Sequence, residues 1–483
     1  MSTYLRAAMA SLVLMLFSRV LGLVRESMLA ASFGTTAMAD VVVVMITLPD
    51  IVANVLATGA LGLVLVPWWA RQLPAAQAAS QKRVALALSG VGAALALGLL
   101  LWPAPLAHLL APGVSESHQA ALLAGVRWSA LALPLSFTAA VWYTRLQHER
   151  DVVGMYGMNV AHTSVVIPVL AGVAFFYSGA HVVGWLGLGL LAAVGLRLGW
   201  LHWRMSRLAH AARTPQAPVE GLPAWRIWCW AGLATGLPVA LPVVARSLVS
   251  SGGDGALATF NYAWKLVELP NLLAIQLVTA LAFPALARAH AEGRGIAVQL
   301  RSAFVLSWTL ACAAALGLAL GAQPVADLLF GWGRMESRHV DEVARWSAWG
   351  AWTLLPQALV AVLVSLLATL GRMRAAALGY ALGLTALLLY GAQGPREVMF
   401  ALVLAFAVAA VVMLFAARRE VAAALAWREM ALPAGLCAAL WAGLRGVSLD
   451  NPWLTLVGAG LAAGLLMGLC VLASPVLRSL LRR

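Results

Sequence analysis

Apolar runs of about 20 residues follow one another along this chain, with short polar connections between them. A run of that length spans the hydrocarbon core of a bilayer when it forms an α-helix. Within lipid, only helices and closed barrels satisfy every backbone N–H and C=O group, and helices there tolerate Gly and Pro. The chain is therefore predicted to be an all-α membrane protein that crosses the bilayer many times.

Fourteen candidate spans can be counted, so the predicted fold is a bundle of about 14 transmembrane helices. Composition agrees, because 63% of the 483 residues are hydrophobic and only 10% are charged, unlike the usage of soluble proteins. The spans lie approximately at residues 5–31, 38–70, 84–110, 120–146, 153–177, 181–203, 225–250, 256–288, 298–322, 342–370, 375–391, 397–417, 428–446 and 452–474.

Basic residues indicate which side of the membrane each connection faces, since cytoplasmic loops are enriched in Lys and Arg. With the N-terminus inside, the inner segments hold 21 basic residues and the outer segments hold five, most of them among acids. Both termini are therefore predicted to be cytoplasmic. The same distribution accounts for the net charge of +14 without a nucleic-acid partner.

The chain also contains an internal repeat, in which two sequence patterns recur after 221 and 222 residues. The pairs are Leu48-Pro49-Asp50-Ile51 with Leu269-Pro270-Asn271-Leu272, and Leu133-Pro134 followed by Arg150 with Leu355-Pro356 followed by Arg372. Two pairs with nearly the same offset predict two six-helix lobes. An even number of spans in each gives both lobes the same orientation, hence a pseudo-twofold axis along the membrane normal.

The predicted domain boundaries follow from this repeat. Residues 1–212 form the first lobe, and 213–223 form a polar, Pro-rich cytoplasmic linker. Residues 224–420 form the second lobe, and 421–483 hold two extra helices and a basic cytoplasmic tail.

A few charged side chains lie inside the predicted spans, where a charge costs roughly 2.5 to 3.5 kcal/mol on insertion scales. The main ones are Arg19, Arg25, Asp40, Arg246, Lys265 and Glu268. Such residues usually face a watery cavity or one another, and the excess of cations predicts a cavity that attracts an anion. The alternative is internal pairing, of Arg19 or Arg25 with Asp40 and of Lys265 with Glu268, which would only hold helices together.

The other polar residues point to neither catalysis nor metal binding. Arg127 and Arg197 lie near predicted helix ends and are expected to extend to the interface. His162 is expected to be a packed core histidine, and the four cysteines to be small packing residues. No ATP-binding loop, metal-binding His cluster or Ser-His-Asp set can be found, so no enzymatic activity, metal or cofactor is expected.

In their order and spacing, the motifs resemble the MurJ/MviN family, the lipid II flippases of the MOP superfamily, over most of the first twelve spans. They are Ser18-Arg-Val-Leu-Gly-Leu-Val-Arg25, Asp40, Leu48-Pro49 leading to Gly59-Ala60 and Val66-Pro67, Asn159 after Arg150, Tyr262-Ala to Glu268-Leu-Pro270, Leu328-Leu-Phe-Gly-Trp-Gly333 and Ala368-Thr-Leu-Gly371. The resemblance implies two lobes around a central cationic cavity, with the last two helices forming a groove for a lipid tail.

The sequence departs from this family at several cavity positions. After the Pro-Asn of the second helix the lipid II flippases usually carry two arginines and then Glu-Gly-Ala, where this chain has Ala53, Asn54 and Thr58-Gly59-Ala60. Where they carry Tyr-Ala-Asp-Arg, this chain has Tyr262-Ala263-Trp264-Lys265. Lys is a point charge rather than a bidentate fork, so phosphate recognition would be looser in geometry.

The resemblance implies an alternating-access flippase. It would carry a polyprenyl-pyrophosphate-linked saccharide, with lipid II as the first candidate, from the inner to the outer leaflet of a bacterial inner membrane. Its implied partners are this lipid-linked saccharide, membrane lipids and other cell-envelope synthesis proteins, and a monomer is expected. The implied substrate-binding residues are Arg19, Arg25, Asp40, Asn54, Lys265 and Glu268, with Asp40 holding the arginines.

Three alternatives stay open. One is a flippase for another lipid-linked glycan of the exopolysaccharide or O-antigen type, which the departures favour. The others are a cation-coupled drug exporter of the same superfamily, and a scaffold that recruits envelope enzymes without transporting anything.

Overall fold

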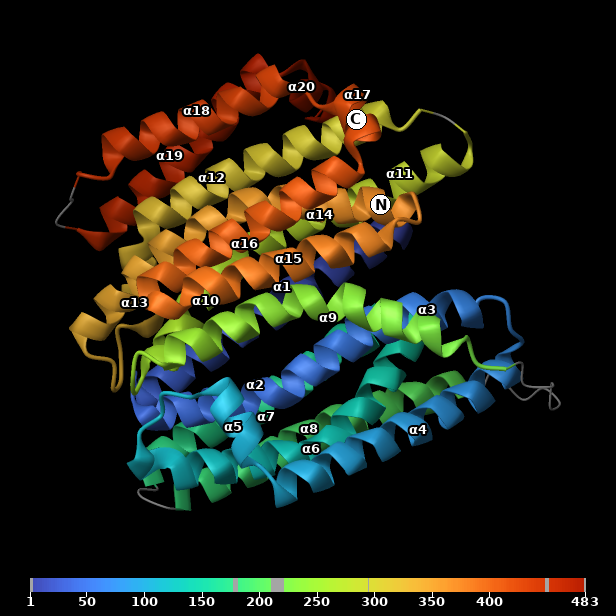
Figure 1. Cartoon of the computed structure of the whole chain (residues 1–483), viewed down its shortest axis with the longest axis vertical. Coiled ribbons are helices and arrows are strands. Elements are labelled where there is room, and N and C mark those ends of the chain that lie inside the picture. Colours follow the sequence, from blue (N-terminus) through green and yellow to red (C-terminus); the bar gives the residue numbers. More distant parts are fainter. Residues whose placement is uncertain (1–2, 177–180, 210–220, 294, 448–450, 482–483) are drawn as a thin grey trace. The chain divides into compact units, whose positions relative to one another are not determined.

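The computed structural model describes residues 3–176, 181–209, 221–293, 295–447 and 451–481. Every regular element in these ranges is a helix, which confirms the predicted all-α class (Figure 1). The chain divides into two compact units. The N-terminal unit comprises Met1–Val239 and Ser250–Ala258, and the C-terminal unit comprises Ala240–Val249 and Thr259–Arg483.

The N-terminal unit is built on long helices that run side by side, with α6 packed against α2, α4 and α8, and α7 against α1 and α8 (Figure 1). Its elements are α1 (Thr3–Phe33), α2 (Ala37–Asn54), the π-helix η1 (Val55–Ala60), α3 (Leu61–Trp69), α4 (Pro74–Leu101), α5 (Ala104–Leu110), α6 (Glu116–His148), α7 (Val152–Phe176), α8 (His181–Ala209) and most of α9 (Trp225–Ser250).

The C-terminal unit is organised around α12, which packs against α13, α14, α18 and α19. Its elements are α10 (Ala256–Pro270), the π-helix η2 (Asn271–Gln276), α11 (Leu277–Ala291), α12 (Ala297–Phe330), α13 (Ser337–Gly350), η3 (Ala351–Thr353), α14 (Leu354–Thr369), α15 (Met373–Tyr390), η4 (Gly391–Gln393), α16 (Pro395–Ala416), α17 (Arg418–Ala424), α18 (Trp427–Leu444), α19 (Pro452–Ala473) and α20 (Pro475–Leu481). Buried Cys312, Cys437 and Cys470 lie in the apolar core between α12, α18 and α19.

Ten helices in the described ranges are long and apolar enough to cross a membrane, and α17 with α18 forms a further pair, bent by 78°, that passes the same test together. The protein is therefore a multi-pass membrane protein. Each of the fourteen predicted spans overlaps a helix or an interrupted helix, and the exact number of crossings stays a prediction. The lobe boundaries also stay predictions; the compact units divide α9, and most of the predicted linker lies outside the described residues.

Both copies of the Leu-Pro motif lie where a membrane helix is interrupted. Pro49 lies in α2, six residues before η1, and Pro270 ends α10 directly before η2. Proline has no N–H to donate, so the carbonyl four residues earlier loses its helical partner. For Pro49 that carbonyl belongs to Met45, and the Ser129 hydroxyl of α6 donates to it over 2.7 Å.

The ends of α6 and α14 also repeat. Arg150 (φ 56°) and Gly371 (φ 68°) have left-handed backbone, and the next N–H in each case donates five residues back, from Asp151 to Leu146 O and from Arg372 to Leu367 O. This is the Schellman ending of a helix. The structural offset is 221 residues, so Arg150 corresponds to Gly371 rather than to Arg372, with which the sequence pattern paired it.

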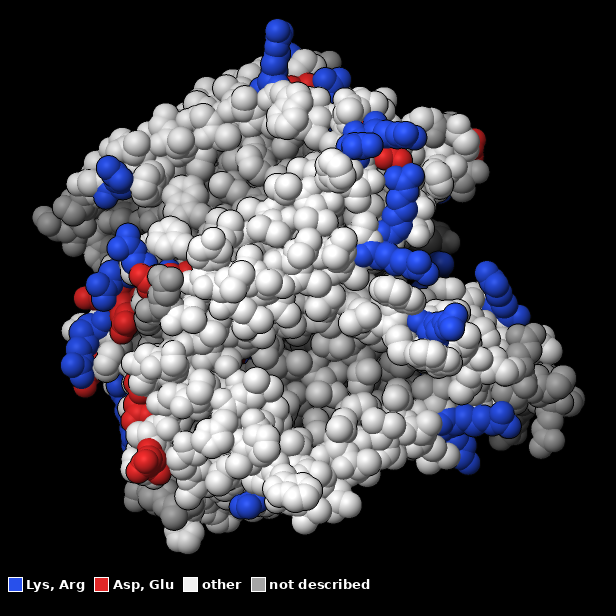
Figure 2. Space-filling view, in the orientation of Figure 1, with Lys and Arg blue, Asp and Glu red and all other residues white. Residues whose placement is uncertain are grey.

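Charged side chains gather at the helix ends (Figure 2). In the C-terminal unit, the end that carries α13 mixes exposed Arg334, Arg338 and Arg345 with acids, whereas the end near α11 and α17 is mainly basic (Figure 2). This distribution agrees with the loop charges that predict cytoplasmic termini, and the orientation itself stays a prediction.

Candidate functional site

Four charged side chains meet inside the N-terminal unit. The Arg25 guanidinium of α1 donates from Nη1 to Asp50 Oδ2 over 3.0 Å and from Nη2 to Glu26 Oε1 over 2.7 Å. Arg197 of α8 donates from Nη2 to the other Asp50 oxygen, Oδ1, over 3.2 Å. One carboxylate at the proline break of α2 thus bridges two arginines from two other helices. We call Arg25, Glu26, Asp50 and Arg197 the Asp50 cluster.

The Asp50 cluster is largely shielded from solvent. The exposed fractions of the side chains are 6% for Arg197, 5% for Glu26, 15% for Arg25 and 22% for Asp50. Two cations face two carboxylates, so the formal charges cancel, which is the condition under which ionised groups persist in a low-dielectric interior. Asp50, with Pro49 beside it, is the most accessible of the four groups.

His162 of α7 lies beside the same carboxylate. It is 2% exposed, and Asp50, Arg197 and Arg25 are the charged groups that act on it. The prediction of a buried core histidine is therefore confirmed. α1, α2, α7 and α8 all contribute a polar side chain to this one region.

Arg197 corrects one prediction. Its position near the end of a predicted span suggested that it extends to the interface, but α8 continues to Ala209, so Arg197 lies three helical turns inside the helix and is buried. Asp50 and Arg197 were both missed as site residues. The only sequence signal was Asp50 beside a membrane proline; nothing in the sequence indicates that α8 brings Arg197 to it.

Asp40 corrects another prediction, because it does not hold Arg19 or Arg25. Its carboxylate is fully buried and accepts hydrogen bonds from Gly255 N and Ala258 N, both over 2.7 Å. Gly255 directly precedes α10 and Ala258 lies in its first turn, where a helix has N–H donors without internal partners and a positive partial charge. Asp40 therefore caps a distant helix.

Arg19 lies on α1 a turn and a half before Arg25, and its side chain is exposed. Among the described residues, no carboxylate lies within salt-bridge distance of it. The structure therefore separates the two predicted arginines: Arg25 is held in the Asp50 cluster, and Arg19 is available to a ligand or to lipid headgroups.

In the C-terminal unit, Lys265 Nζ donates to Glu268 Oε2 over 2.7 Å. The internal pair that was the alternative to an anion-binding cavity is therefore formed for these two residues. Both side chains remain partly accessible, at 24% and 35%. Asn271 of η2 lies six residues after Lys265, and its side-chain amide donates to Gln357 Oε1. Gln357 in turn donates to Thr353 Oγ1 over 3.0 Å. These polar groups lie at the interrupted helix of this unit, as Asp50 does in the other.

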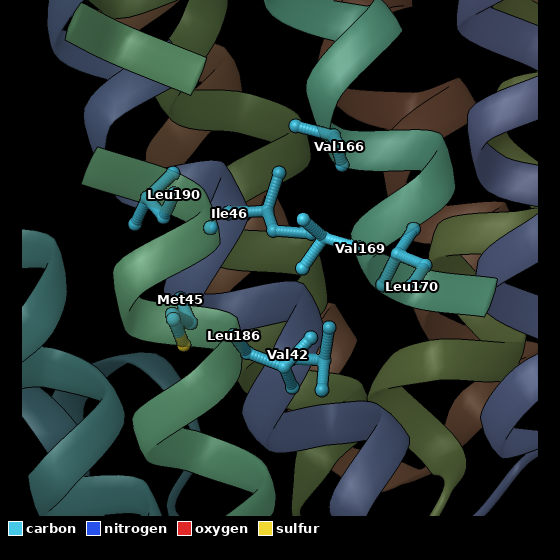
Figure 3. Close-up of a pocket in the computed structure, with 9 residues that line it drawn as sticks. Val42, Met45, Ile46, Val166, Val169, Leu170, Leu186 and Leu190 are labelled. Carbon is cyan, nitrogen blue, oxygen red and sulfur yellow. The ribbon is translucent and has the colours of Figure 1, made fainter. Parts of the chain in front are cut away.

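Asn54, the remaining predicted site residue, ends α2, and its side chain lies outside the described part of the structure. No group of three or more His, Cys, Asp or Glu side chains that could hold a metal ion occurs among the described residues. A pocket between α2, α7 and α8 is lined by Val42, Met45, Ile46, Val166, Leu170 and other apolar side chains (Figure 3). Such a lining offers nothing to a phosphate or a sugar, so the Asp50 cluster is the better candidate site.

Comparisons with known proteins agree on one family. A family model described as "Lipid II flippase MurJ" matches residues 29–444. The lipid II flippase MurJ of Burkholderia cenocepacia is 27% identical over 357 residues, which cover 68% of this chain and 66% of that protein. The probable lipid II flippase MurJ of Rhizobium meliloti is 27% identical over 329 residues, or 65% and 61% of the two chains. The matches thus span just under two thirds of these curated relatives.

Solved structures show the same fold. An inward closed conformation of lipid II flippase MurJ superposes with a TM-score of 0.79 at 14% identity, covering 96% of this chain and 99% of the other. An inward-facing multidrug resistance MATE family transporter of the MOP superfamily gives a TM-score of 0.63 at 15% identity, covering 84% and 95%. At sequence identities of 14% and 15%, these superpositions show a shared fold and carry no statement about function.

Proposed function

We propose that this chain, which belongs to the lipid II flippase MurJ family, moves a polyprenyl-pyrophosphate-linked saccharide across a membrane. The family match over residues 29–444 carries the proposal, since it includes most of the helices of both units. Lipid II is the first cargo to test. The direction is from the inner to the outer leaflet of a bacterial inner membrane, by alternating access, with both termini cytoplasmic.

Cations within the helices supply the chemistry that such a cargo requires. A pyrophosphate headgroup carries several negative charges that must leave water, and charge-assisted hydrogen bonds from Arg or Lys offset that loss. Arg19 and Arg25 of α1 and Lys265 of α10 are the cations assigned to it. Glu268 would hold Lys265 until the substrate arrives.

A second candidate is a flippase for another polyprenyl-linked glycan. It is favoured by Ala53 and Lys265, which replace arginines that lipid II flippases usually carry. All such lipids share the pyrophosphate, so the arginine side chains cannot distinguish lipid II from the others. A drug exporter has only the MATE fold in its favour.

The test is complementation of a bacterial strain depleted of its own lipid II flippase. We expect the chain to restore growth and outer-leaflet lipid II, measured by a labelling assay on intact cells. A well-expressed chain that fails, but whose loss in its own host makes another lipid-linked glycan accumulate in the inner leaflet, would identify the second candidate. If its loss causes no lipid-linked sugar to accumulate, the transport function is wrong and a scaffold role remains.

A further inference from the structure

We infer that Arg197 is a second phosphate-binding cation beside Arg25, and that Asp50 is an internal anion which occupies the phosphate position while no substrate is bound. This inference rests on the proposed function and adds two residues to its substrate site. Neither residue was expected there from the sequence.

The geometry around Asp50 is that of an anion-binding site already filled by the protein itself. Two guanidinium groups from α1 and α8 each donate to a different oxygen of the same carboxylate, over 3.0 and 3.2 Å. Guanidinium N–H groups donate the same kind of charge-assisted hydrogen bond to phosphate oxygens as to carboxylate oxygens. A phosphate group in this position would meet both guanidiniums at once.

The two arginines also have hydrogen-bonding capacity that the carboxylate does not use. Among the described residues, Nε of Arg25 and Nε of Arg197 are buried and have no acceptor. Buried donors are nearly always satisfied in native structures, so two of them on adjacent arginines call for an explanation. A carboxylate offers two oxygens and a phosphate group offers more, so phosphate is the better match.

Charge explains why Asp50 must leave when the substrate binds. The Asp50 cluster is formally neutral, with Glu26 as the second acid and His162 adjacent. A pyrophosphate added to this set would place a third and a fourth negative charge against two cations. Displacing Asp50 removes one of the opposing charges, and Asp50 is both the most exposed member and the one next to Pro49, where α2 lacks a backbone hydrogen bond.

Arg197 also replaces a positive charge that this chain lacks elsewhere. The lipid II flippases usually carry two arginines where this chain has Ala53 and Asn54. Here α8 brings a guanidinium to the same stretch of α2, within 3.2 Å of the residue three positions before Ala53. Arg197 of α8 thus joins Arg25 of α1 as a cation for the pyrophosphate.

The experiment is a binding titration of purified protein in nanodiscs with undecaprenyl pyrophosphate, which carries the headgroup without sugars. Arg197→Gln should weaken binding roughly tenfold or more, as expected for the loss of one charge-assisted hydrogen bond. Asp50→Asn should tighten binding severalfold, because the internal competitor loses its charge. Arg127→Gln is the matched control: Arg127 is an exposed arginine of the same unit whose Nε donates to the Leu100 carbonyl, and its loss should leave binding unchanged.

The double variant Asp50→Asn with Arg197→Gln keeps the cluster neutral and guards against misfolding of the single variants. It should melt near the wild-type temperature. It should bind more tightly than Arg197→Gln, because the competing charge is gone, and more weakly than Asp50→Asn, because Arg197 is gone. An affinity equal to that of Asp50→Asn in this variant, or weaker binding by folded Asp50→Asn, overturns the inference and leaves the Asp50 cluster a structural one. Excess inorganic pyrophosphate should displace the lipid, and failure to do so contradicts the phosphate assignment. Wild-type protein that binds no undecaprenyl pyrophosphate contradicts the proposed function itself.

Discussion

At the residue scale, the two aspartates of α2 show two different ways to keep a carboxylate inside a membrane helix. Asp40 is fully buried and is satisfied by two backbone N–H groups. Asp50 is partly accessible and is satisfied by two arginine side chains. Backbone donors are fixed in place, whereas side chains can change partners. We therefore assign a structural role to Asp40 and a role in binding to Asp50.

The structural role of Asp40 can be tested by substitution. Asp40→Ala leaves two buried N–H donors of the α10 turn unsatisfied, and each costs about 1–3 kcal/mol. We expect a lower melting temperature in detergent and less protein in the membrane, with Asp40→Asn intermediate because one oxygen acceptor remains. Unchanged stability together with lost transport would instead place Asp40 in the substrate site.

At the element scale, α2 lacks a backbone hydrogen bond at its proline, and a side chain of the neighbouring helix α6 replaces it. Pro49 removes the donor for Met45 O, and Ser129 of α6 supplies a hydroxyl in its place. Ser129 is fully buried, so no water can take over this contact without rearrangement. The Ser129 side chain thus replaces the backbone hydrogen bond that α2 lacks next to Asp50.

This dependence gives a paired prediction. Ser129→Ala should lower the free energy of unfolding by about 1–3 kcal/mol, because Met45 O loses its donor. Adding Pro49→Ala should recover stability, since residue 49 then has an N–H that can donate to that carbonyl. Thermal unfolding of the two variants in detergent measures the effect. A double variant no more stable than Ser129→Ala would show that the proline is not the reason Ser129 is needed.

At the scale of the whole molecule, the predicted cytoplasmic segments hold 21 basic residues and the predicted outer segments hold five. Lys and Arg are retained on the cytoplasmic side during insertion, so this asymmetry sets the orientation of the chain. The proposed direction of transport depends on that orientation.

Cysteine labelling in intact cells tests the orientation. In a background without the four native cysteines, Arg338→Cys should react with a membrane-impermeant maleimide, and Arg71→Cys should react only after lysis. Both side chains are exposed in the structure, so accessibility within the fold is not limiting. The opposite labelling pattern would invert the predicted topology and the direction of transport.

The sequence by itself determined the class of the fold. Runs of apolar residues of membrane length can satisfy their backbone only as helices, and this requirement is local, so it can be recognised without knowing which helices touch. The two copies of Leu-Pro, 221 residues apart, both lie at interrupted helices, because a proline acts on its own helix.

Only the tertiary structure decided which charges meet. Arg25 was expected with Asp40 and is paired with Asp50; Arg197 was expected at the interface and is buried against the same carboxylate. Arg197 lies 147 residues from Asp50, and no spacing rule relates residues on different helices. Partner choice depends on how α1, α2 and α8 pack, which is fixed by many apolar contacts at once rather than by the charged residues themselves.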